Sequence, residues 1–523
     1  MAPTRRKLRR PAAKKKAQAT GPRPARDSST GSSDRSSSEG GSSASSDGPS
    51  DEDDPRDYKH GGYHPVMPYQ LYSGRYRVLS KLGAGAFSTV WLCADERDQR
   101  EDGPDLVAMK VCKSKKSVTE QAEDEVLLLE RLESGGASPS HVTQMRGHFW
   151  HSGPNGRHKC MVFEVMGENL LALVKHHDYN GLPLPLVRRL SRHTLSGLEY
   201  IHSRGVIHTD VKLENVLVQR HDFAELLCEA RRAHRAFMEQ KKGTVDLLSK
   251  AQKKRMKKKE KKTAGKAPEA AAAAAADEAD DKGEADQEDK GGDADEAAAE
   301  ACGRPVPPVR QRERFDTLDF CQVNAKLADF GNGVFSNRKV TDDIQTRQYR
   351  SPEVIIGTAW DETADVWSAA CMIFELATGD FLFDPHADDG WSRDEDHLAL
   401  MTELLGDLPP REWALSGKYS KEFFNNSGKL KHIKSLKYWA LIDVLKEKYS
   451  MSQEVAAEIS DFLMPMLTWE PRARRTASEA LKHPWVQPVP GDAPDGAAPA
   501  TLPPRGAAPL GSPEAAAAEA PAP

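Results

Sequence analysis

The middle of the chain contains a long tract that cannot build a hydrophobic core, and this tract divides the sequence that can. Residues 220–314 begin with a helix-like stretch from Phe223 to Met238 and continue through a lysine run, an alanine tract and an acidic tract. Beyond its first turns, this composition predicts a disordered insertion. The sequence with the pattern of a globular protein therefore forms two blocks, residues 76–219 and 315–487. Together these blocks are too long for one small hydrophobic core, and their length suits a two-lobed enzyme.

Both ends of the chain are also expected to be disordered. Residues 1–75 pass from basic clusters around Arg5 and Lys14 into Ser- and Gly-rich sequence, and residues 488–523 are rich in Pro and Ala. The basic clusters fit a nuclear-import signal, a solvated tail or the start of an organellar transit peptide, and these alternatives stay open. If the clusters are a nuclear-import signal, the protein is expected in both the cytoplasm and the nucleus.

Charge and cysteine usage exclude several classes of protein. The net charge is -5, so indiscriminate nucleic-acid binding is not implied. The basic stretch Lys253 to Lys262 contains no aromatic residue on which a base could stack, so direct nucleic-acid binding is not expected. The 7 cysteines are scattered without a C-x-x-C pair, which disfavours a disulfide framework or a zinc site and indicates a reducing compartment. No apolar run approaches the ~18 residues of a membrane span, so no membrane partner is expected.

The first block starts with the pattern of strands and ends with the pattern of helices. From Tyr76, short runs of apolar and β-branched residues alternate with turn residues, which is typical of strands. After Leu182, apolar residues recur at spacings of three to five, as they do on the buried face of a helix. A strand-rich part followed by a helix-rich part predicts an α+β fold.

A glycine-rich segment from Leu82 to Val90 lies between two strand-like runs. It is therefore expected to form a hairpin turn and not the strand-to-helix turn of a dinucleotide site. Glycines at 83 and 85 would let backbone N–H groups approach phosphate oxygens closely. An ordinary glycine-rich hairpin explains the segment as well, because Ser88 occupies the place of the usual third glycine.

A lysine inside an apolar strand requires an anion nearby. Lys110 ends the run Val-Ala-Met-Lys, and an unpaired ammonium is costly to bury. In the helix-like stretch that follows, Glu125 shares a face with leucines three, four and seven positions further on. Glu125 is therefore expected to point inward and pair with Lys110. A snorkelling surface lysine and a solvated glutamate are the alternative.

Two later motifs supply the groups that phosphoryl transfer requires. After His208 come Asp210, Lys212 and Asn215, and the second block contains Asp329 followed by Phe-Gly. One carboxylate can orient a hydroxyl nucleophile, oxygen ligands can hold magnesium, and a cation can neutralise charge on the moving phosphoryl group. The motifs in this order, with strands before and helices after, are far more specific together than any one of them alone.

The complete set of motifs resembles the eukaryotic protein kinase family over both blocks. It includes G-x-G-x-x-S-x-V, V-A-M-K, the His208 motif, D-F-G, Ser351-Pro-Glu and Asp365-Val-Trp-Ser. This resemblance implies a bilobal fold with a small β-rich N-lobe and a large helical C-lobe. The stretches around Ile207-His-Thr-Asp and Asp343-Ile-Gln-Thr-Arg-Gln-Tyr-Arg further resemble the SR-protein kinases, which phosphorylate serines in Arg/Ser-rich segments of splicing factors. The long insertion is also similar to that family.

The resemblance implies a serine kinase that uses ATP and Mg²⁺, and it suggests a role for each matching residue. Asp210 would orient the substrate hydroxyl and accept its proton, and Lys212 would stabilise the transferred phosphoryl group. Asn215 and Asp329 would hold magnesium. Glu353 and Arg474 resemble a buried ion pair of the large lobe. The residues implied in ATP binding are Leu82, Gly83, Ala84, Gly85, Ala86, Phe87, Ser88, Val90, Lys110, Glu125 and, at the hinge, Glu164 and Met166.

Two further features bear on regulation and substrate choice. Thr209 stands where most protein kinases carry an arginine that reads a phosphate on the activation loop, so activity without activation-loop phosphorylation is expected. By resemblance, Asp380, Asp396 and Glu403 match an acidic groove in the C-lobe that docks Arg-rich substrate. A solvated acidic surface is the alternative for this region.

The expected partners are Arg/Ser-rich splicing proteins, and a monomer is expected. Two rival functions remain: another kinase of the same broad branch with a different substrate preference, and a catalytically inactive kinase-fold scaffold for basic partners. Phe330 and Pro352 stand where SR-protein kinases usually have leucine, which leaves the first rival open. The presence together of Lys110, Asp210 and the two expected metal ligands argues against the scaffold.

Overall fold

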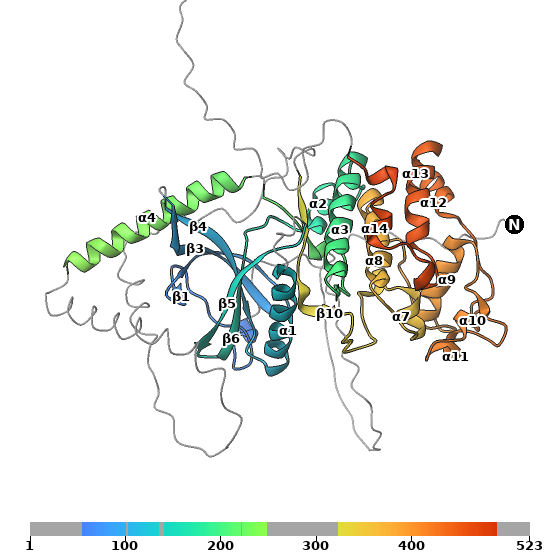
Figure 1. The fold of residues 1–523 in the computed structure, drawn as a ribbon, viewed down its shortest axis with the longest axis horizontal. Helices are drawn as coiled ribbons and strands as arrows, with labels where there is room; N and C mark the ends of the chain where they lie inside the picture. Colours follow the sequence, from blue (N-terminus) through green and yellow to red (C-terminus); the bar gives the residue numbers. More distant parts are fainter. Residues whose placement is uncertain (1–54, 101–102, 135–140, 221, 248–322, 489–523) are drawn as a thin grey trace, which may run out of the picture.

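The computed structural model describes residues 55–100, 103–134, 141–220, 222–247 and 323–488. They form two lobes, a small one built on a β-sheet and a large one built of helices (Figure 1). The predicted α+β bilobal fold is therefore confirmed. The disorder expected for residues 1–54, 248–314 and 489–523 concerns segments outside the described residues.

The small lobe contains a six-stranded antiparallel sheet in the order β1-β2-β3-β4-β6-β5. Helix α1 packs against β4, β5 and β6. Its apolar face, which includes Leu128 and Leu132, is buried as the periodicity predicts. The elements are β1 (Leu71–Tyr72), β2 (Tyr76–Ala84), β3 (Ser88–Arg100), β4 (Gly103–Cys112), α1 (Lys116–Glu133), β5 (Met145–Gly153) and β6 (Gly156–Phe163).

The large lobe is built around α3 and α8, which pack against each other. Every residue of α8 is buried, because this helix passes through the middle of the lobe. None of the helices in the described ranges is long and apolar enough to cross a membrane. The α-helices are α2 (Leu170–His176), α3 (Leu184–Ser203), α7 (Pro352–Ile356), α8 (Thr363–Thr378), α9 (Arg393–Leu405), α10 (Arg411–Ala414), α11 (Ser420–Phe423), α12 (Leu441–Glu447), α13 (Gln453–Leu463) and α14 (Ala477–Ala480).

Short antiparallel strand pairs join the two sequence blocks. Strand β8 (Val216–Val218) pairs with β9 (Ala325–Leu327), and β7 (Val206–Ile207) pairs with β10 (Val334–Phe335). The strand before the insertion is thus hydrogen-bonded to the strand after it. Because the entropy of closing a loop grows only slowly with its length, a long insertion is compatible with this pairing. The two blocks fold together, as the motif order predicts.

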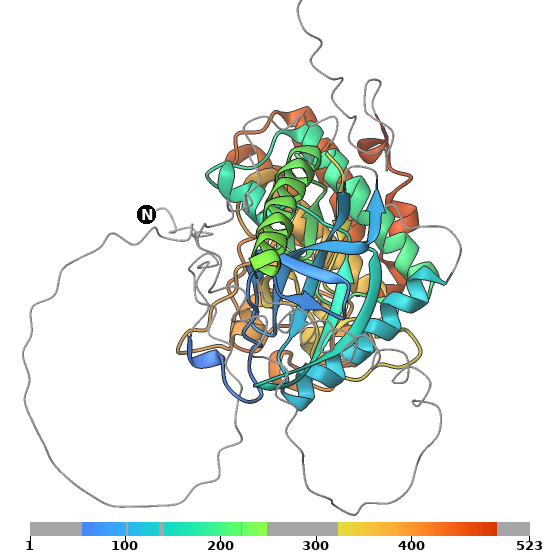
Figure 2. The ribbon, with the colours of Figure 1, turned by 90° about the vertical axis from the view of Figure 1, so that its left-hand side faces the viewer.

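The insertion begins with a helix that belongs to the small lobe. Helix α4 (Phe223–Leu247) contacts β2, β3 and β4, and Figure 2 shows it lying across the strands of this lobe. Its buried residues Leu226, Ala230 and Ala233 complete an apolar cluster with Leu79, Leu92, Ala94, Leu106 and Val165. The helix-like stretch from Phe223 to Met238 is therefore present, but the structure differs from the expected spacer, which started at residue 220.

The structure also differs from the expected N-terminal tail, because residues 55–70 lie on the small lobe. We call these residues the N-terminal strap. Within it, the ring of His64 is buried 4.6 Å from that of His151, 5.1 Å from that of His158 and 5.9 Å from that of Tyr72, between centroids. Burial, together with the two neighbouring histidines, lowers the pKa of His64 to about 3, so this ring is uncharged at neutral pH. Aromatic burial orders a segment whose Gly-rich and polar composition had suggested disorder.

Candidate active site

Lys110 on β4 and Glu125 on α1 form the ion pair that the sequence predicts. The Nζ of Lys110 lies 2.9 Å from both carboxylate oxygens of Glu125 and 3.1 Å from Oδ1 of Asp329. Burial alone would lower the pKa of Lys110, but the carboxylates of Glu125 and Asp329 outweigh burial and raise it. Lys110 is therefore a cation at neutral pH, held between the sheet, α1 and the second sequence block.

The glycine-rich segment is the hairpin between β2 and β3, as predicted. The N–H of Gly85 donates to the carbonyl of Ser88 at 2.9 Å, which closes the turn. A Cβ atom at Gly83 or Gly85 would meet no atom within 4 Å, so no neighbouring protein atom requires glycine there. Val90 lies opposite Lys110 across β3 and β4, which places the hairpin beside the lysine. The arrangement leaves exposed backbone at the hairpin tip for a ligand to contact.

Asp210 accepts hydrogen bonds from four side chains. Its Oδ2 atom accepts from Lys212 Nζ at 2.8 Å, Asn215 Nδ2 at 3.2 Å and Asn332 Nδ2 at 3.3 Å. Its Oδ1 atom accepts from the Thr346 hydroxyl at 2.7 Å. Burial would raise the pKa of Asp210, but the Lys212 charge and the hydrogen bonds from Lys212 and Thr346 outweigh burial and lower it. The carboxylate is thus ionised and fixed in orientation, as a group that receives a proton from a hydroxyl must be.

Asp329 is brought to the same site by the pairing of the two blocks. The N–H of Ala328 donates to the carbonyl of Asn215 at 2.9 Å, and Nε2 of His208 lies 3.0 Å from the Ala328 carbonyl oxygen. The charge of Lys110 is the main cause that lowers the pKa of Asp329. Because Asn215 Nδ2 donates to Asp210, the amide oxygen of Asn215 is the atom of this side chain that could ligate a cation. In the part of the chain that the structure describes, no group of three or more His, Cys, Asp or Glu could hold a metal by itself.

The predicted hinge, Glu164 to Met166, connects β6 to the large lobe. The carboxylate of Glu164 accepts hydrogen bonds from Lys326 Nζ at 2.7 and 2.9 Å. Its side chain is therefore engaged with β9, and the contact with adenine that the resemblance implies would be made by backbone groups of this segment. Met166 is buried, and the N–H of Gly167 donates to the Val218 carbonyl at 2.7 Å.

The three predicted docking residues all have partners inside the large lobe. Asp380, which follows α8, accepts hydrogen bonds from Lys448 Nζ and the Tyr449 hydroxyl, both at 2.9 Å. Asp396 and Glu403 lie two turns apart on α9 and are buried. Asp396 accepts from the backbone N–H of residue 386, and Glu403 from that of residue 437, each at 2.9 Å. These carboxylates therefore hold neighbouring loops in place.

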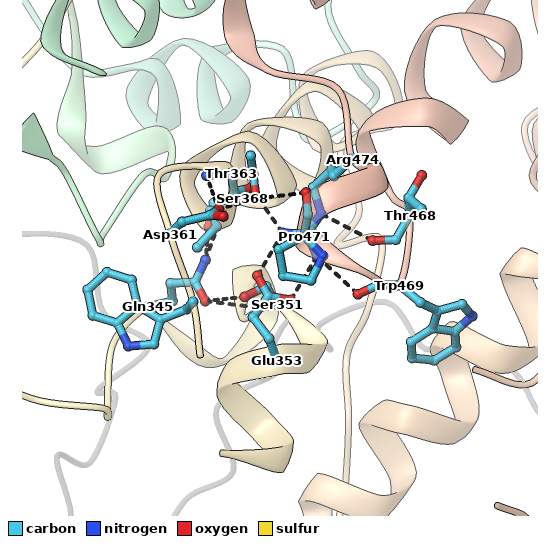
Figure 3. Close-up of polar contacts among 12 residues, drawn as sticks. Gln345, Ser351, Glu353, Asp361, Thr363, Ser368, Thr468, Trp469, Pro471 and Arg474 are labelled. Carbon is cyan, nitrogen blue, oxygen red and sulfur yellow. Dashed lines mark hydrogen bonds and ion pairs between the residues drawn. The ribbon is translucent and has the colours of Figure 1, made fainter. Parts of the chain in front are cut away.

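Glu353 and Arg474 form the buried ion pair that the sequence predicts in the large lobe. Two nitrogens of Arg474 donate to the two carboxylate oxygens of Glu353, each at 2.7 Å, and both side chains are 0% exposed. Arg474 also donates to the carbonyls of Thr363 and Thr468 at 3.0 and 3.1 Å (Figure 3). One guanidinium thus joins α7, the start of α8 and the segment that follows α13.

Three polar residues of the site carry no sequence pattern that predicts their roles. Thr346 and Asn332 donate to Asp210, as described above. The buried amide of Gln345 accepts from the N–H of Ser351 at 2.9 Å and donates to Ser368 Oγ at 2.9 Å (Figure 3). Gln345 and Thr346 lie in the stretch Asp343 to Arg350 that resembles the SR-protein kinases, and Asn332 follows the Asp329-Phe-Gly motif, but neither pattern indicates what these side chains contact.

Comparison with known proteins agrees with this geometry. A family model described as protein kinase domain matches residues 76–227 and 318–486, which is more than half of the chain. The chain belongs to the protein kinase family.

Several known kinases are similar to most of this chain. The serine/threonine-protein kinase SRPK of Physarum polycephalum is 39% identical over 444 residues, and the match covers 84% of this chain and 92% of that kinase. SRSF protein kinase 3 of Mus musculus is 38% identical over 519 residues (84% and 91%), and protein kinase dsk1 of Schizosaccharomyces pombe is 36% identical over 478 residues (84% and 85%). Within the protein kinases, this chain is a serine/threonine kinase of the SRSF protein kinase family.

Proposed function

We propose that this protein transfers the γ-phosphate of ATP to serines in Arg/Ser-rich segments of splicing factors. The main observation behind the proposed chemistry is that four donors orient the carboxylate of Asp210 beside the loop of Asp329. The substrate class follows from relatives that are named SRSF protein kinases. A monomer distributed between cytoplasm and nucleus is part of the same proposal.

Each residue of the site has a role in this proposal. Asp210 binds the serine hydroxyl and takes its proton, while Lys212, 2.8 Å from that carboxylate, stabilises the transferred phosphoryl group. Lys110 contacts the α- and β-phosphates, and Glu125 keeps the lysine charged and in place. The backbone of the glycine-rich hairpin covers the phosphates, and the backbone of the hinge segment contacts adenine.

The donor set near Asp329 fits magnesium. The carboxylate of Asp329 and the amide oxygen of Asn215 are hard oxygen ligands, and Mg²⁺ usually takes one or two protein ligands together with phosphates and water. When bound, the ion would neutralise charge on the phosphates. A site with only two protein ligands agrees with the lack of a self-sufficient metal cluster among the described residues.

We also propose that the catalytic loop is held without an activation-loop phosphate. Thr209 has φ 64°, which is strained for a β-branched residue. The backbone N–H groups of His208 and Thr209 donate to the two carboxylate oxygens of Asp365, each at 2.8 Å, and the Thr209 hydroxyl donates to the Asn332 carbonyl at 2.7 Å. These bonds restrain the catalytic loop through groups of this chain alone, which supports the proposal.

The enzyme treated with a broad phosphatase is therefore expected to keep its full kcat. Intact-mass and peptide mass spectrometry would verify that Thr341, Thr346 and Tyr349 carry no phosphate in the treated sample. The mock-treated enzyme is the control. The proposal fails if activity disappears on treatment and returns only with stoichiometric phosphate on one of these residues.

Docking of Arg-rich substrate by Asp396 and Glu403 gives a second prediction. The double variant Asp396→Asn/Glu403→Gln keeps an acceptor oxygen for each backbone N–H but removes both charges. We expect KM for an Arg/Ser-repeat peptide to rise about tenfold, which corresponds to the loss of one charge-assisted hydrogen bond. KM for a serine peptide without arginine should stay unchanged.

The matched control is Asp388→Asn/Asp389→Asn, because these two carboxylates are exposed in the neighbouring turn. Steady-state kinetics with both peptides and with a Ser-Pro peptide would decide the substrate class. Equal increases in KM for all peptides would reject the docking role, and a preference for the Ser-Pro peptide would favour another kinase of the same branch.

A further inference from the structure

A contact outside the kinase motifs joins the N-terminal strap to the glycine-rich hairpin. The hydroxyl of Tyr63 donates a hydrogen bond to the carbonyl oxygen of Gly85 at 2.5 Å, across 22 positions of sequence. Tyr63 is 6% exposed, whereas Gly85 lies in the exposed tip of the hairpin. A buried side chain thus contacts the exposed backbone that is proposed to cover the phosphates.

Tyr63 is itself held by contacts to its backbone and to its ring. The side-chain amide of Asn155, in the turn between β5 and β6, donates to the Tyr63 carbonyl at 2.6 Å. Lys113 Nζ lies 4.2 Å from the centroid of the Tyr63 ring and 3.3 Å from Oδ2 of Asp57 in the same strap. The neighbouring His64 is buried among histidines, as described above. The phenol therefore has little freedom to move away from the hairpin.

The strap and Lys113, the residue directly after β4, hold two carbonyls of the hairpin tip. Besides the bond from Tyr63 to Gly85, the backbone N–H of Lys113 donates to the Phe87 carbonyl at 2.9 Å. The side chain of Lys113 also contacts the Tyr63 ring, so Lys113 helps to hold both hydrogen bonds in place. Ala86, between the two held carbonyls, is exposed.

Because the peptide unit is planar, the orientation of the Gly85 carbonyl fixes the orientation of the Ala86 N–H. The carbonyl of Gly85 and the N–H of Ala86 belong to one planar trans unit and point in opposite directions. Without the bond from Tyr63, glycine at 85 would let this unit rotate easily, because no Cβ restricts it. Holding the Gly85 carbonyl toward the strap therefore holds the Ala86 N–H away from the strap.

We propose that Tyr63 is a positioning residue for nucleotide binding, whose hydroxyl presets the Ala86 N–H as a donor to the phosphates of ATP. The proposal rests on the proposed function, in which the hairpin covers those phosphates. Preorganisation of this kind lowers the entropy lost on binding. It also assigns a function to a segment that precedes the first kinase motif.

The test is Tyr63→Phe in the full-length protein, since phenylalanine keeps the ring and its contact with Lys113. The dissociation constants of ATP, ADP and adenosine would be measured by calorimetry, together with steady-state kinetics. We expect affinity for ATP and ADP to fall about three- to tenfold, as for loss of one hydrogen bond. Affinity for adenosine, KM for the peptide and kcat at saturating ATP should stay unchanged. The control is Tyr72→Phe, because the Tyr72 hydroxyl bonds Gln70 at 3.0 Å and not the hairpin.

Three results would overturn this role. Unchanged affinity for ATP in the Tyr63→Phe variant would reject it while leaving the proposed function intact. Equal weakening of ADP and adenosine would assign the strap a general structural role only. Failure of the wild-type protein to bind ATP would reject the proposed function first and the role of Tyr63 with it.

Discussion

Asp210→Asn is expected to lower kcat about a thousandfold, within the range that general base catalysis supplies. The amide has no carboxylate oxygen to accept a proton from serine. In the wild-type protein both carboxylate oxygens accept hydrogen bonds, Oδ1 from Thr346 and Oδ2 from Lys212, Asn215 and Asn332. Asparagine would replace one of these oxygens with an NH₂ group, which would then face a donor. The reacting hydroxyl would therefore lose both its base and its orientation.

Single-turnover phosphorylation of an Arg/Ser peptide would measure this loss, with the affinity for ATP determined in parallel. That affinity should stay within about twofold, because Lys110 and Asp329 are untouched. Asp389→Asn, an exposed change of the same chemistry, is the control and should keep wild-type kcat. A variant at position 210 that retains a tenth or more of the wild-type rate would exclude Asp210 as the base.

Arg474→Met is expected to destabilise the large lobe by about 3–5 kcal/mol, because it leaves the Glu353 carboxylate buried without its partner. The pair is fully buried, with two bonds of 2.7 Å. The same change removes the donor to the carbonyls of Thr363 and Thr468, which adds to the cost. Urea unfolding followed by tryptophan fluorescence would measure the loss.

The double variant Glu353→Leu/Arg474→Met should recover part of this stability, because it removes the stranded charge. Glu458→Gln is the control: it breaks the more exposed pair between Arg188 and Glu458, which has one bond of 2.6 Å, and should cost less than about 1 kcal/mol. A loss below 1 kcal/mol in Arg474→Met would show that this guanidinium does not hold the lobe together.

Local patterns predicted one part of the site, and the resemblance to protein kinases predicted another. Glu125 could be oriented from the helical period of its leucines, and the cost of a buried ammonium then selected it as the partner of Lys110. Asp210 and Asp329 could be brought together only by the order of motifs and the resemblance to protein kinases. Their contact depends on the pairing of β8 with β9 across the insertion, which no periodicity indicates.

The parts that sequence did not predict depend on partners far along the chain. Tyr63 contacts positions 22 and 92 residues away, so its Gly-rich neighbourhood gives no sign of order. The helical period of α4 was visible, but its small buried residues Ala230 and Ala233 do not indicate which surface they cover. Thr346 lies in a segment without regular structure, where only the folded catalytic loop shows what its hydroxyl bonds.

The position of α4 has a mechanical consequence for the two lobes. Within the described residues, the chain passes between the lobes at the segment after β6 and again between Gln219 and Phe223, where β8 is followed by α4. Beside the second crossing, Arg220 and Asp222 form a buried ion pair with bonds of 2.7 and 3.0 Å. The lobes are also in contact where α1 packs against residues 330–332 and where Lys110 bonds Asp329. We expect the second chain connection, together with these contacts, to leave the small lobe a narrower range of movement relative to the large lobe than a single connection would.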